Sequence, residues 1–339
     1  MSLEFTELVK LGKAVAKADP KTSLTFSFNN ETLSYEAMQE TLRQEMNELA
    51  GDYKSYRRNQ LQLFELIEEI MDEVLPKKVL DRYMDFAEVK TFAQGDRPIF
   101  KRRTGHKRAK QFITKVGLSG RYEVFKLGEE SFEVKTSAIG GAAQIGLEEF
   151  LDGRVDFAEL TQIVMEGMDE LIQREVANAL IASVNQLPAA NKVVGNGFEE
   201  AQMDRLLATA ASYGEPTIYC TLEFAVKMVP EEGWRSDRMK DERWNNGFLA
   251  NYKGKRVVIL PQSFEDETNS KKVIDPRYVW IIPSGVNDKP VKIAMEGETI
   301  VKEWENRDNS REVQVYKKVG VNAIMNNGIC CYQDSTLTF

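Results

Sequence analysis

The feature that most constrains the fold is a continuous helical pattern between Asp156 and Leu187. Its apolar residues recur at intervals of three and four positions, which keeps them on one helix face. This stripe consists of Phe157, Leu160, Val164, Met168, Leu171, Ile172, Val176, Leu180, Val184 and Leu187. Asp156 and Glu159 have capping-box spacing, and Pro188 cannot continue the helix. At ~1.5 Å per residue the helix spans about 45–48 Å, which suits a molecule that bridges neighbours.

Composition describes an ordinary soluble protein. The 339 residues are 42% hydrophobic and 29% charged, which is enough for a sizeable core and about two domains. The net charge of −8 argues against general affinity for nucleic acids, which leaves a basic imprint on a domain. The N-terminus lacks the apolar core of a secretory signal, and no run approaches the ~18 apolar residues of a membrane span. We therefore expect a cytoplasmic product with no membrane contact.

The N-terminal third combines an arm with helices. Residues 1–32 show little periodicity, so we expect an extended arm there. Residues 33–50 carry an apolar helical stripe that stops at Gly51. A second, strongly acidic helix is predicted over 53–75, with Pro76 ending it.

The character changes from about Lys90 to Gly141, where short strands are separated by glycines. The predicted strands are Phe112–Val116, Tyr122–Phe125 and Ser131–Lys135. Between Lys101 and Lys110, the sequence KRRTGHKRAK contains six Lys or Arg residues and the only histidine, His106. The pattern indicates an extended loop with a concentrated positive tip.

A compact mixed α/β domain is predicted after the long helix. Residues 199–212 read as a helix, and short strands and helices then alternate. The alternating segments are Thr217–Cys220, Leu222–Met228, Arg256–Leu260 and Tyr278–Ile282. The last forty residues resemble antiparallel strands, at Thr299–Trp304, Glu312–Tyr316 and Ala323–Met325. We expect this sheet to pair with segments that precede the long helix.

Motifs for catalysis or cofactor binding are missing from the sequence. A single histidine supports neither a Ser-His-Asp set nor a zinc cluster, and no Walker loop is present. Gly140-Gly141 lacks the further glycines of a dinucleotide loop and reads as a flexible strand connection. Cys220, Cys330 and Cys331 have neither disulfide nor metal spacing, so we expect buried free thiols. The sequence predicts no enzyme, no cofactor and no metal.

The order of these elements resembles a known family. An N-terminal arm, a loop with a basic tip, the long helix in GLEEFLDGRVDFAELTQIVMEGMDELIQREVANALIASV, an α/β domain and the closing strands ENRDNSREVQVYKKVGVNAIMNNGICCYQDS occur in this order. The order is similar to that of the major capsid proteins of tailed bacteriophages, which have the Hong Kong 97-type fold. Local similarity is confined to about 140–186 and 300–335.

The resemblance implies an α+β fold with a long spine helix, an extended β-hairpin loop, a peripheral antiparallel sheet and a central α/β axial domain. It maps onto five segments of this chain. They are the N-terminal arm with helices (1–80), the extension loop with its basic tip (81–141), the peripheral strand and spine helix (142–187), the axial domain (188–298) and the peripheral C-terminal strands (299–339).

The resemblance also suggests which residues make contacts. The predicted contact residues between subunits are Lys101, Arg102, Arg103, Lys107, Arg108 and Lys110. Helix carboxylates of a neighbour, such as Glu159, Glu166, Asp169 and Glu170, would supply complementary charge. A solvated loop and a nucleic-acid patch remain alternatives. The predicted spine-helix core consists of Phe157, Leu160, Val164, Met168, Leu171, Val176 and Leu180.

The implied function is self-assembly into the icosahedral head shell of a tailed bacteriophage around double-stranded DNA. Expected partners are the chain itself in hexamers and pentamers, a scaffold, the portal and other head proteins, and DNA contacted weakly on the inner face. Assembly would take place in the host cytoplasm, and the mature location would be the virion capsid. The charged helices at 33–75 could be a scaffolding remnant or an ordered arm. An encapsulin-type shell and an unrecognised soluble α/β enzyme are the alternatives.

Overall fold

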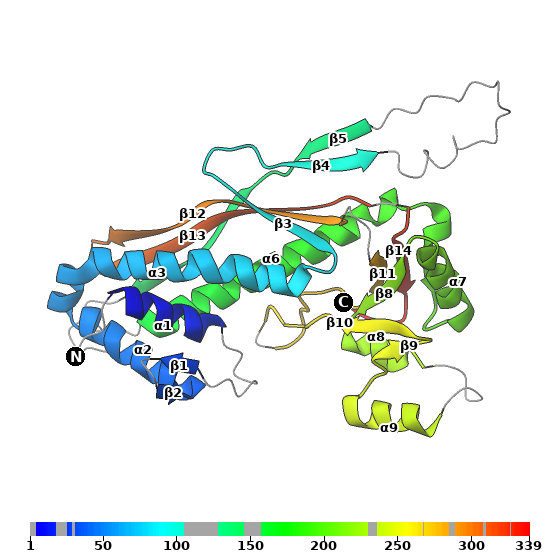
Figure 1. Cartoon of the computed structure of the whole chain (residues 1–339), viewed down its shortest axis with the longest axis horizontal. Coiled ribbons are helices and arrows are strands. Elements are labelled where there is room, and N and C mark those ends of the chain that lie inside the picture. The colour runs from blue at the N-terminus through cyan, green and yellow to red at the C-terminus, as the bar shows by residue number, and fades with distance from the viewer. Residues whose placement is uncertain are drawn as a thin grey trace, which may run out of the picture. The chain divides into compact units, whose positions relative to one another are not determined.

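The chain folds into two compact units (Figure 1). The computed structural model describes residues 5–17, 26–28, 31–104, 128–145, 157–229, 236–266, 268–284, 289–307, 310–325 and 327–339. Unit 1 comprises Met1–Asp96, Thr136–Val176 and Ile293–Gly320. Unit 2 comprises Arg97–Lys135, Ala177–Lys292 and Val321–Phe339.

Unit 1 begins with a helix where the sequence predicted an extended arm. Helix α1 (Phe5–Lys17) buries Leu8, Leu11 and Val15. It lies so close to α3 (Tyr53–Tyr83) that a Cβ on Gly12 would come within 2.2 Å of Ile70 Cδ1. The prediction was wrong because a short three-to-four-residue period went unrecognised. The residues that follow α1 include a small hairpin, β1 (Phe26–Phe28) and β2 (Glu31–Leu33).

The two predicted helices after the arm are present, but the second is longer than expected. Helix α2 (Tyr35–Ala50) is capped by Ser34, whose Oγ accepts from the backbone N–H of Ala37 at 3.3 Å, and it ends before Gly51 as predicted. Helix α3 does not end at Pro76. It continues to Tyr83 because Val79 and Tyr83 are buried in the core, and this burial offsets the helix bond that proline removes.

The long helix predicted from the apolar stripe is present as α6 (Phe157–Ser183). It ends one turn earlier than expected. Val184–Gln186 forms a 3-10 turn, closed by a hydrogen bond of 3.1 Å from Leu187 N–H to the Val184 carbonyl. Asp156 of the predicted capping box lies outside the described residues.

Four strands form the sheet of unit 1, in the order β3-β12-β13-β6. They are β3 (Ala87–Phe92), β12 (Val291–Glu305), β13 (Arg311–Ala323) and β6 (Ser137–Ile145). Strands β13 and β6 are antiparallel, which confirms the predicted pairing of late strands with a segment that precedes the long helix. Gly140 lies inside β6 rather than in a connection, and a Cβ there would approach the Val315 carbonyl oxygen to 2.1 Å.

One part of β12 is covered by helix α3 instead of by another strand. The backbone N–H of Thr299 donates to Asp72 Oδ1 at 2.7 Å, and that of Val301 donates to Glu68 Oε1 at 2.8 Å. A stretch of strand that no neighbouring strand covers has free N–H groups, which invite unwanted pairing with another chain. The acidic face of α3, which reads in the sequence as a solvated surface, therefore satisfies this stretch of backbone.

Unit 2 is built on a six-stranded mixed sheet in the order β7-β14-β11-β8-β10-β9. The strands are β7 (Lys192–Gly195), β14 (Cys330–Asp334), β11 (Tyr278–Ser284), β8 (Glu215–Cys220), β10 (Lys255–Ile259) and β9 (Asn251–Tyr252). The helices are α7 (Glu200–Ala211), α8 (Leu222–Lys227) and α9 (Asp237–Asn246). The mixed α/β character agrees with the sequence prediction, although α9 was not predicted.

The end of the chain differs from the predicted series of three peripheral strands. Ala323 ends β13, and no separate strand forms at Ala323–Met325 in the described structure. The last strand, β14, pairs with β11 and β7 of unit 2. Buried Asn191 holds the segment just before β14, because its Nδ2 donates to the carbonyls of Asn327 and Ile329 at 2.8 Å each.

The three cysteines are buried and free, as the sequence predicted. Burial raises the pKa of Cys220, Cys330 and Cys331 to about 12. Their thiols therefore stay protonated at neutral pH and behave as small apolar side chains.

Candidate functional site

The described part of the loop that was predicted to carry a basic tip is a two-stranded hairpin. Strands β4 (Ile99–Thr104) and β5 (Gly128–Glu133) are antiparallel, with Phe100 stacked on Phe132 at a centroid distance of 6.1 Å. Their register places Arg102 opposite Glu130 and Arg103 opposite Glu129. Residues of opposite charge thus occupy paired positions across the base of the hairpin.

The structure places only part of the predicted basic tip. Lys101 is exposed on β4, and Arg102 and Arg103 follow it on the same strand. Lys107, Arg108 and Lys110 lie outside the described residues, as do the predicted strands Phe112–Val116 and Tyr122–Phe125. The role of this tip in contacts between subunits stays a prediction.

A buried carboxylate in unit 1 joins the two chain segments that lead into the hairpin. Glu296 of β12 accepts a hydrogen bond from the Gly95 N–H at 3.1 Å, just before the hairpin. It also accepts one from Thr136 Oγ1 at 2.5 Å, just after the hairpin, and an ion pair links it to Lys318 Nζ at 3.0 Å. We name these four residues the hairpin root. No local sequence pattern indicates the root, because its members are distant in the chain.

Electrostatics keep the hairpin root charged. The hydrogen bond from Thr136, followed by those from Lys318 and Gly95, lowers the pKa of Glu296 to about 2. A carboxylate that accepts several hydrogen bonds is stabilised in its charged form. The root therefore holds together the start and the end of a long excursion of the chain at all pH values near neutrality.

The helix carboxylates that were expected to receive the basic tip of a neighbour differ in availability. Glu159 and Glu166 are exposed on α6. Asp169 is engaged within its own chain, since its Oδ2 lies 2.7 Å from Arg82 Nη1 of α3. Glu166 accepts from Gln162 Nε2 at 2.9 Å on the same helix. Glu159 and Glu166 are thus more exposed to another molecule than Asp169 is.

The predicted spine-helix residues divide into two groups in the structure. Phe157, Met168, Val176 and Leu180 are buried, whereas Leu160, Val164 and Leu171 are half-buried. Phe157 stacks on Tyr56 of α3 with a centroid distance of 5.4 Å. Met165 and Ile172 are also buried, so the buried stripe includes a residue that the prediction missed, Met165.

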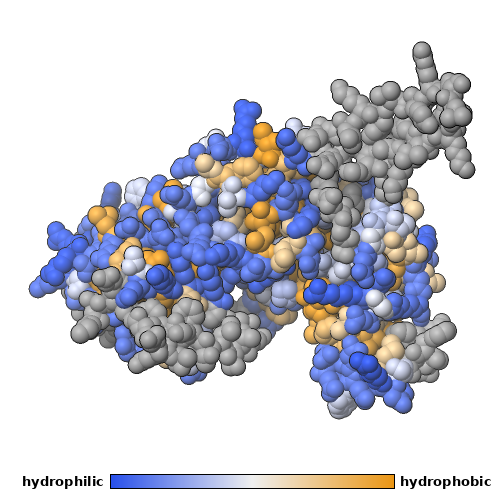
Figure 2. Space-filling model, in the orientation of Figure 1, coloured by the Kyte–Doolittle hydropathy of each residue, from blue (hydrophilic) through white to orange (hydrophobic). Residues whose placement is uncertain are grey.

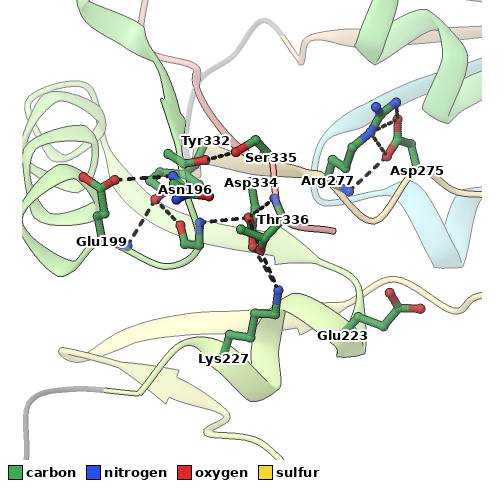
Figure 3. A network of polar contacts seen from close by, with 12 residues as sticks. Asn196, Glu199, Glu223, Lys227, Asp275, Arg277, Tyr332, Asp334, Ser335 and Thr336 are labelled. Carbon is green, nitrogen blue, oxygen red and sulfur yellow. Dashed lines mark hydrogen bonds and ion pairs between the residues drawn. The ribbon is translucent and has the colours of Figure 1, made fainter. Parts of the chain in front are cut away.

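In unit 2, the loop that follows β7 is fastened to the end of β14 by a polar network (Figure 3). Asp334 is fully buried, and its Oδ1 accepts from the Gly197 N–H at 3.0 Å and the Thr336 N–H at 2.8 Å. Lys227 of α8 lies 3.3 Å from Oδ2. Burial favours the neutral acid, but the hydrogen bonds and Lys227 outweigh it and hold the pKa of Asp334 below its ordinary value.

Tyr332 completes this network. Its hydroxyl donates to the Gly197 carbonyl at 2.6 Å and accepts from the Glu199 N–H at 3.1 Å. Gly195 must lack a side chain, because a Cβ there would approach the Tyr332 hydroxyl to 2.1 Å. The network serves to fix backbone and presents no nucleophile or acid-base pair to a cleft.

No group of three or more His, Cys, Asp or Glu side chains within the described residues is placed to hold a metal ion. Among the helices of this described part, none is both long and apolar enough to cross a membrane.

Comparisons with known proteins identify the family. The sequence pattern of the family described as "SPbeta prophage-derived putative capsid protein YonB" matches residues 7–333. No curated protein sequence matches the chain.

Several solved structures of low sequence identity resemble the chain. The capsid of Cyanophage P-SCSP1u matches with a TM-score of 0.51 and 8% identity, over 75% of this chain and 88% of that chain. The head protein of Helicobacter pylori bacteriophage KHP40 matches with a TM-score of 0.48 and 13% identity, over 75% and 92% of the two chains. The SrpI encapsulin of Synechococcus elongatus matches with a TM-score of 0.48 and 12% identity, over 77% of this chain and 89% of that chain. The chain therefore belongs to the YonB family of prophage-derived capsid proteins, which are structural rather than enzymatic, and it has the mixed α+β fold of Hong Kong 97-type capsids.

Proposed function

We propose that this chain is the major capsid protein of a tailed bacteriophage and that its copies form the icosahedral shell around double-stranded DNA. The observation that carries the proposal is the family match over residues 7–333, which includes both units. Shell subunits bury large surfaces against several neighbours, so a protruding hairpin and a long helix become interface material. Hexamers and pentamers of the chain would be the building blocks, and the virion capsid its mature location.

The hairpin is the element that we assign to contacts between subunits. At the base of the hairpin, the basic residues of β4 are matched in number by the acidic residues of β5. The net positive charge of the hairpin therefore comes from the residues beyond Thr104. We infer that Lys107, Arg108 and Lys110 meet exposed carboxylates of a neighbour, with Glu159 and Glu166 of α6 as the favoured partners. Such contacts set orientation and partner choice more than affinity.

The remaining assignments follow the same proposal. Residues 1–80 would be the arm with helices, 81–141 the extension loop, and 142–187 with 299–320 the peripheral domain. The axial domain would be 188–298 together with the end of the chain, because β14 pairs within the sheet of unit 2. A scaffold, the portal and other head proteins would be further partners in assembly in the host cytoplasm. Packaged DNA would be contacted weakly, in keeping with the net charge of −8.

Two measurements test the proposal. Negative-stain microscopy and light scattering of the purified protein should show closed shells or capsomer rings, and a lone monomer at every concentration and salt would contradict self-assembly. Particles from cells in which the prophage has been induced should hold nuclease-resistant double-stranded DNA. Shells that enclose a protein cargo instead would support the encapsulin-type alternative.

A further inference from the structure

Helix α9 of unit 2 contributes nothing to the core of its own chain. None of its ten residues is buried. The helix is held by its ends, since Ser236 Oγ accepts from Met239 N–H at 3.3 Å and Gly247 adopts a left-handed φ of 78°. Isolated helices shorter than about 12–15 residues are marginal in water. A helix of this kind is expected to gain a packing partner when the protein performs its function.

A groove of about 520 Å³ lies between α8 and α9. Val226, Val229, Met239 and Leu249 line it, and Figure 2 shows hydrophobic residues over α8 beside the mainly hydrophilic α9. Trp244 stands at the groove with 89% of its surface exposed, more than any other large apolar side chain in the described residues. Exposed apolar surface of this kind marks an interaction site.

The rim of the groove is basic. Lys240 and Arg243 line it, and Lys240 lies 3.0 Å from Asp237 of the same helix. Arg243 donates to the Val226 carbonyl at 3.3 Å and has no carboxylate partner among the described residues. The groove therefore favours an occupant that brings an apolar side chain and a negative charge.

Between β10 and β11, the same unit carries a second, preformed hairpin that offers both an apolar side chain and a negative charge. The Val273 N–H donates to the Ser263 carbonyl at 3.0 Å, and Glu265 and Lys271 are joined by a backbone bond of 2.9 Å. Phe264 projects from this hairpin with 41% of its surface exposed. Because the backbone is already fixed, little conformational entropy would be lost when Phe264 docks.

Asp266, at the turn of this hairpin, supplies the negative charge. Its carboxylate accepts from the backbone N–H groups of Ser270 at 2.9 Å and Lys271 at 2.8 Å, and from the side chain of Thr268. These hydrogen bonds keep the carboxylate ionised, and none of them comes from a cationic side chain. Phe264 and Asp266 thus complement the apolar floor and the Arg243 rim of the groove.

We propose that Phe264 of one copy docks into the α8–α9 groove of the next copy, beside Trp244, with Asp266 facing Arg243. This inference rests on the proposed shell function. In Figure 1 the segment that carries Phe264, between β10 and β11, lies on a different side of unit 2 from α9, so the two surfaces are distinct. A contact between two different surfaces of identical chains is heterologous, and repetition of it generates a ring when the rotation between copies closes.

Cysteine cross-linking in assembled particles tests the contact. Trp244→Cys combined with Phe264→Cys should give a ladder of disulfide-linked multimers under mild oxidation, whereas each single variant should give none. Particles assembled from a mixture of the two single variants should yield covalent dimers. The native cysteines do not interfere, because all three are buried.

A matched control places the cysteine at another exposed tryptophan instead of at Trp244. Trp304, exposed by 56%, belongs to β12 of unit 1. Trp304→Cys with Phe264→Cys should therefore give no multimers. Particles of normal yield without a Trp244–Phe264 cross-link, or with an equal cross-link to Trp304, would overturn this inference and leave the shell function standing. Failure of the parent chain to assemble under any condition would overturn both.

Discussion

The buried ion pair between β13 and α3 predicts an asymmetric response to the loss of its two members. Lys317 is only 3% exposed, and its Nζ lies 2.5 Å from Asp72 Oδ1. The same oxygen accepts from the backbone N–H of Thr299 at 2.7 Å and from its hydroxyl at 2.6 Å. The Asp72 side chain is 29% exposed and retains contact with solvent.

We expect Asp72→Ala to be much more damaging than Lys317→Met. Removal of Asp72 leaves a buried ammonium without its carboxylate and two Thr299 donors without their acceptor, which costs about 3–5 kcal/mol. Lys317→Met removes the cation and fills its space, while Asp72 keeps the Thr299 donors and water, so the cost is about 1–2 kcal/mol. The whole stability of a domain is only about 5–15 kcal/mol.

The double variant completes the cycle. Asp72→Ala with Lys317→Met no longer buries an unpaired charge, so it should be more stable than Asp72→Ala alone. Urea denaturation of unassembled subunits, followed by circular dichroism, measures the three free energies of unfolding. Equal costs for the two single variants, or a double variant no better than Asp72→Ala, would refute the reasoning.

Three further predictions concern the helix, the hairpin root and the loop tip. Met168→Asp, at a 2% exposed site, should unfold unit 1 and give insoluble protein, whereas Ile163→Asp, at a 61% exposed site on the same helix, should stay soluble and melt normally. The lowered pKa of Glu296 means that its contribution to stability is complete above pH 4.5 and is lost as the pH falls to about 2. Glu296→Gln should remove this part of the acid dependence of unfolding, and an unchanged pH profile would exclude the assignment. Lys107→Glu with Arg108→Glu should leave the melting temperature within a few degrees of the parent but reduce particle yield, and parental yield with parental salt sensitivity would identify a merely solvated loop.

Several elements could be predicted from the sequence because their signals are local. The apolar stripe from Phe157 onward required a long helix, and α6 provides one. Gly51 marked the end of α2. Residues 199–212 carried the pattern that α7 follows. The spacing of apolar residues along a single segment indicates which face of a helix is apolar. This local pattern is sufficient to predict that the segment forms a helix and packs that face against a core.

Other features depended on segments that are far apart in the chain. Pro76 is tolerated inside α3 because Val79 and Tyr83 are buried beyond it. The hairpin root joins Gly95, Thr136 and Glu296, and no local pattern connects them.

The sequence by itself determined the long helix, the mixed α/β character of the second half and the basic composition of the loop. Only the tertiary structure decided that β14 joins the sheet of unit 2 and that the acidic face of α3 covers part of β12. The physical reason is that periodicity encodes which residues are buried, whereas the partner that buries them is chosen by competition between distant segments for hydrogen bonds and apolar surface.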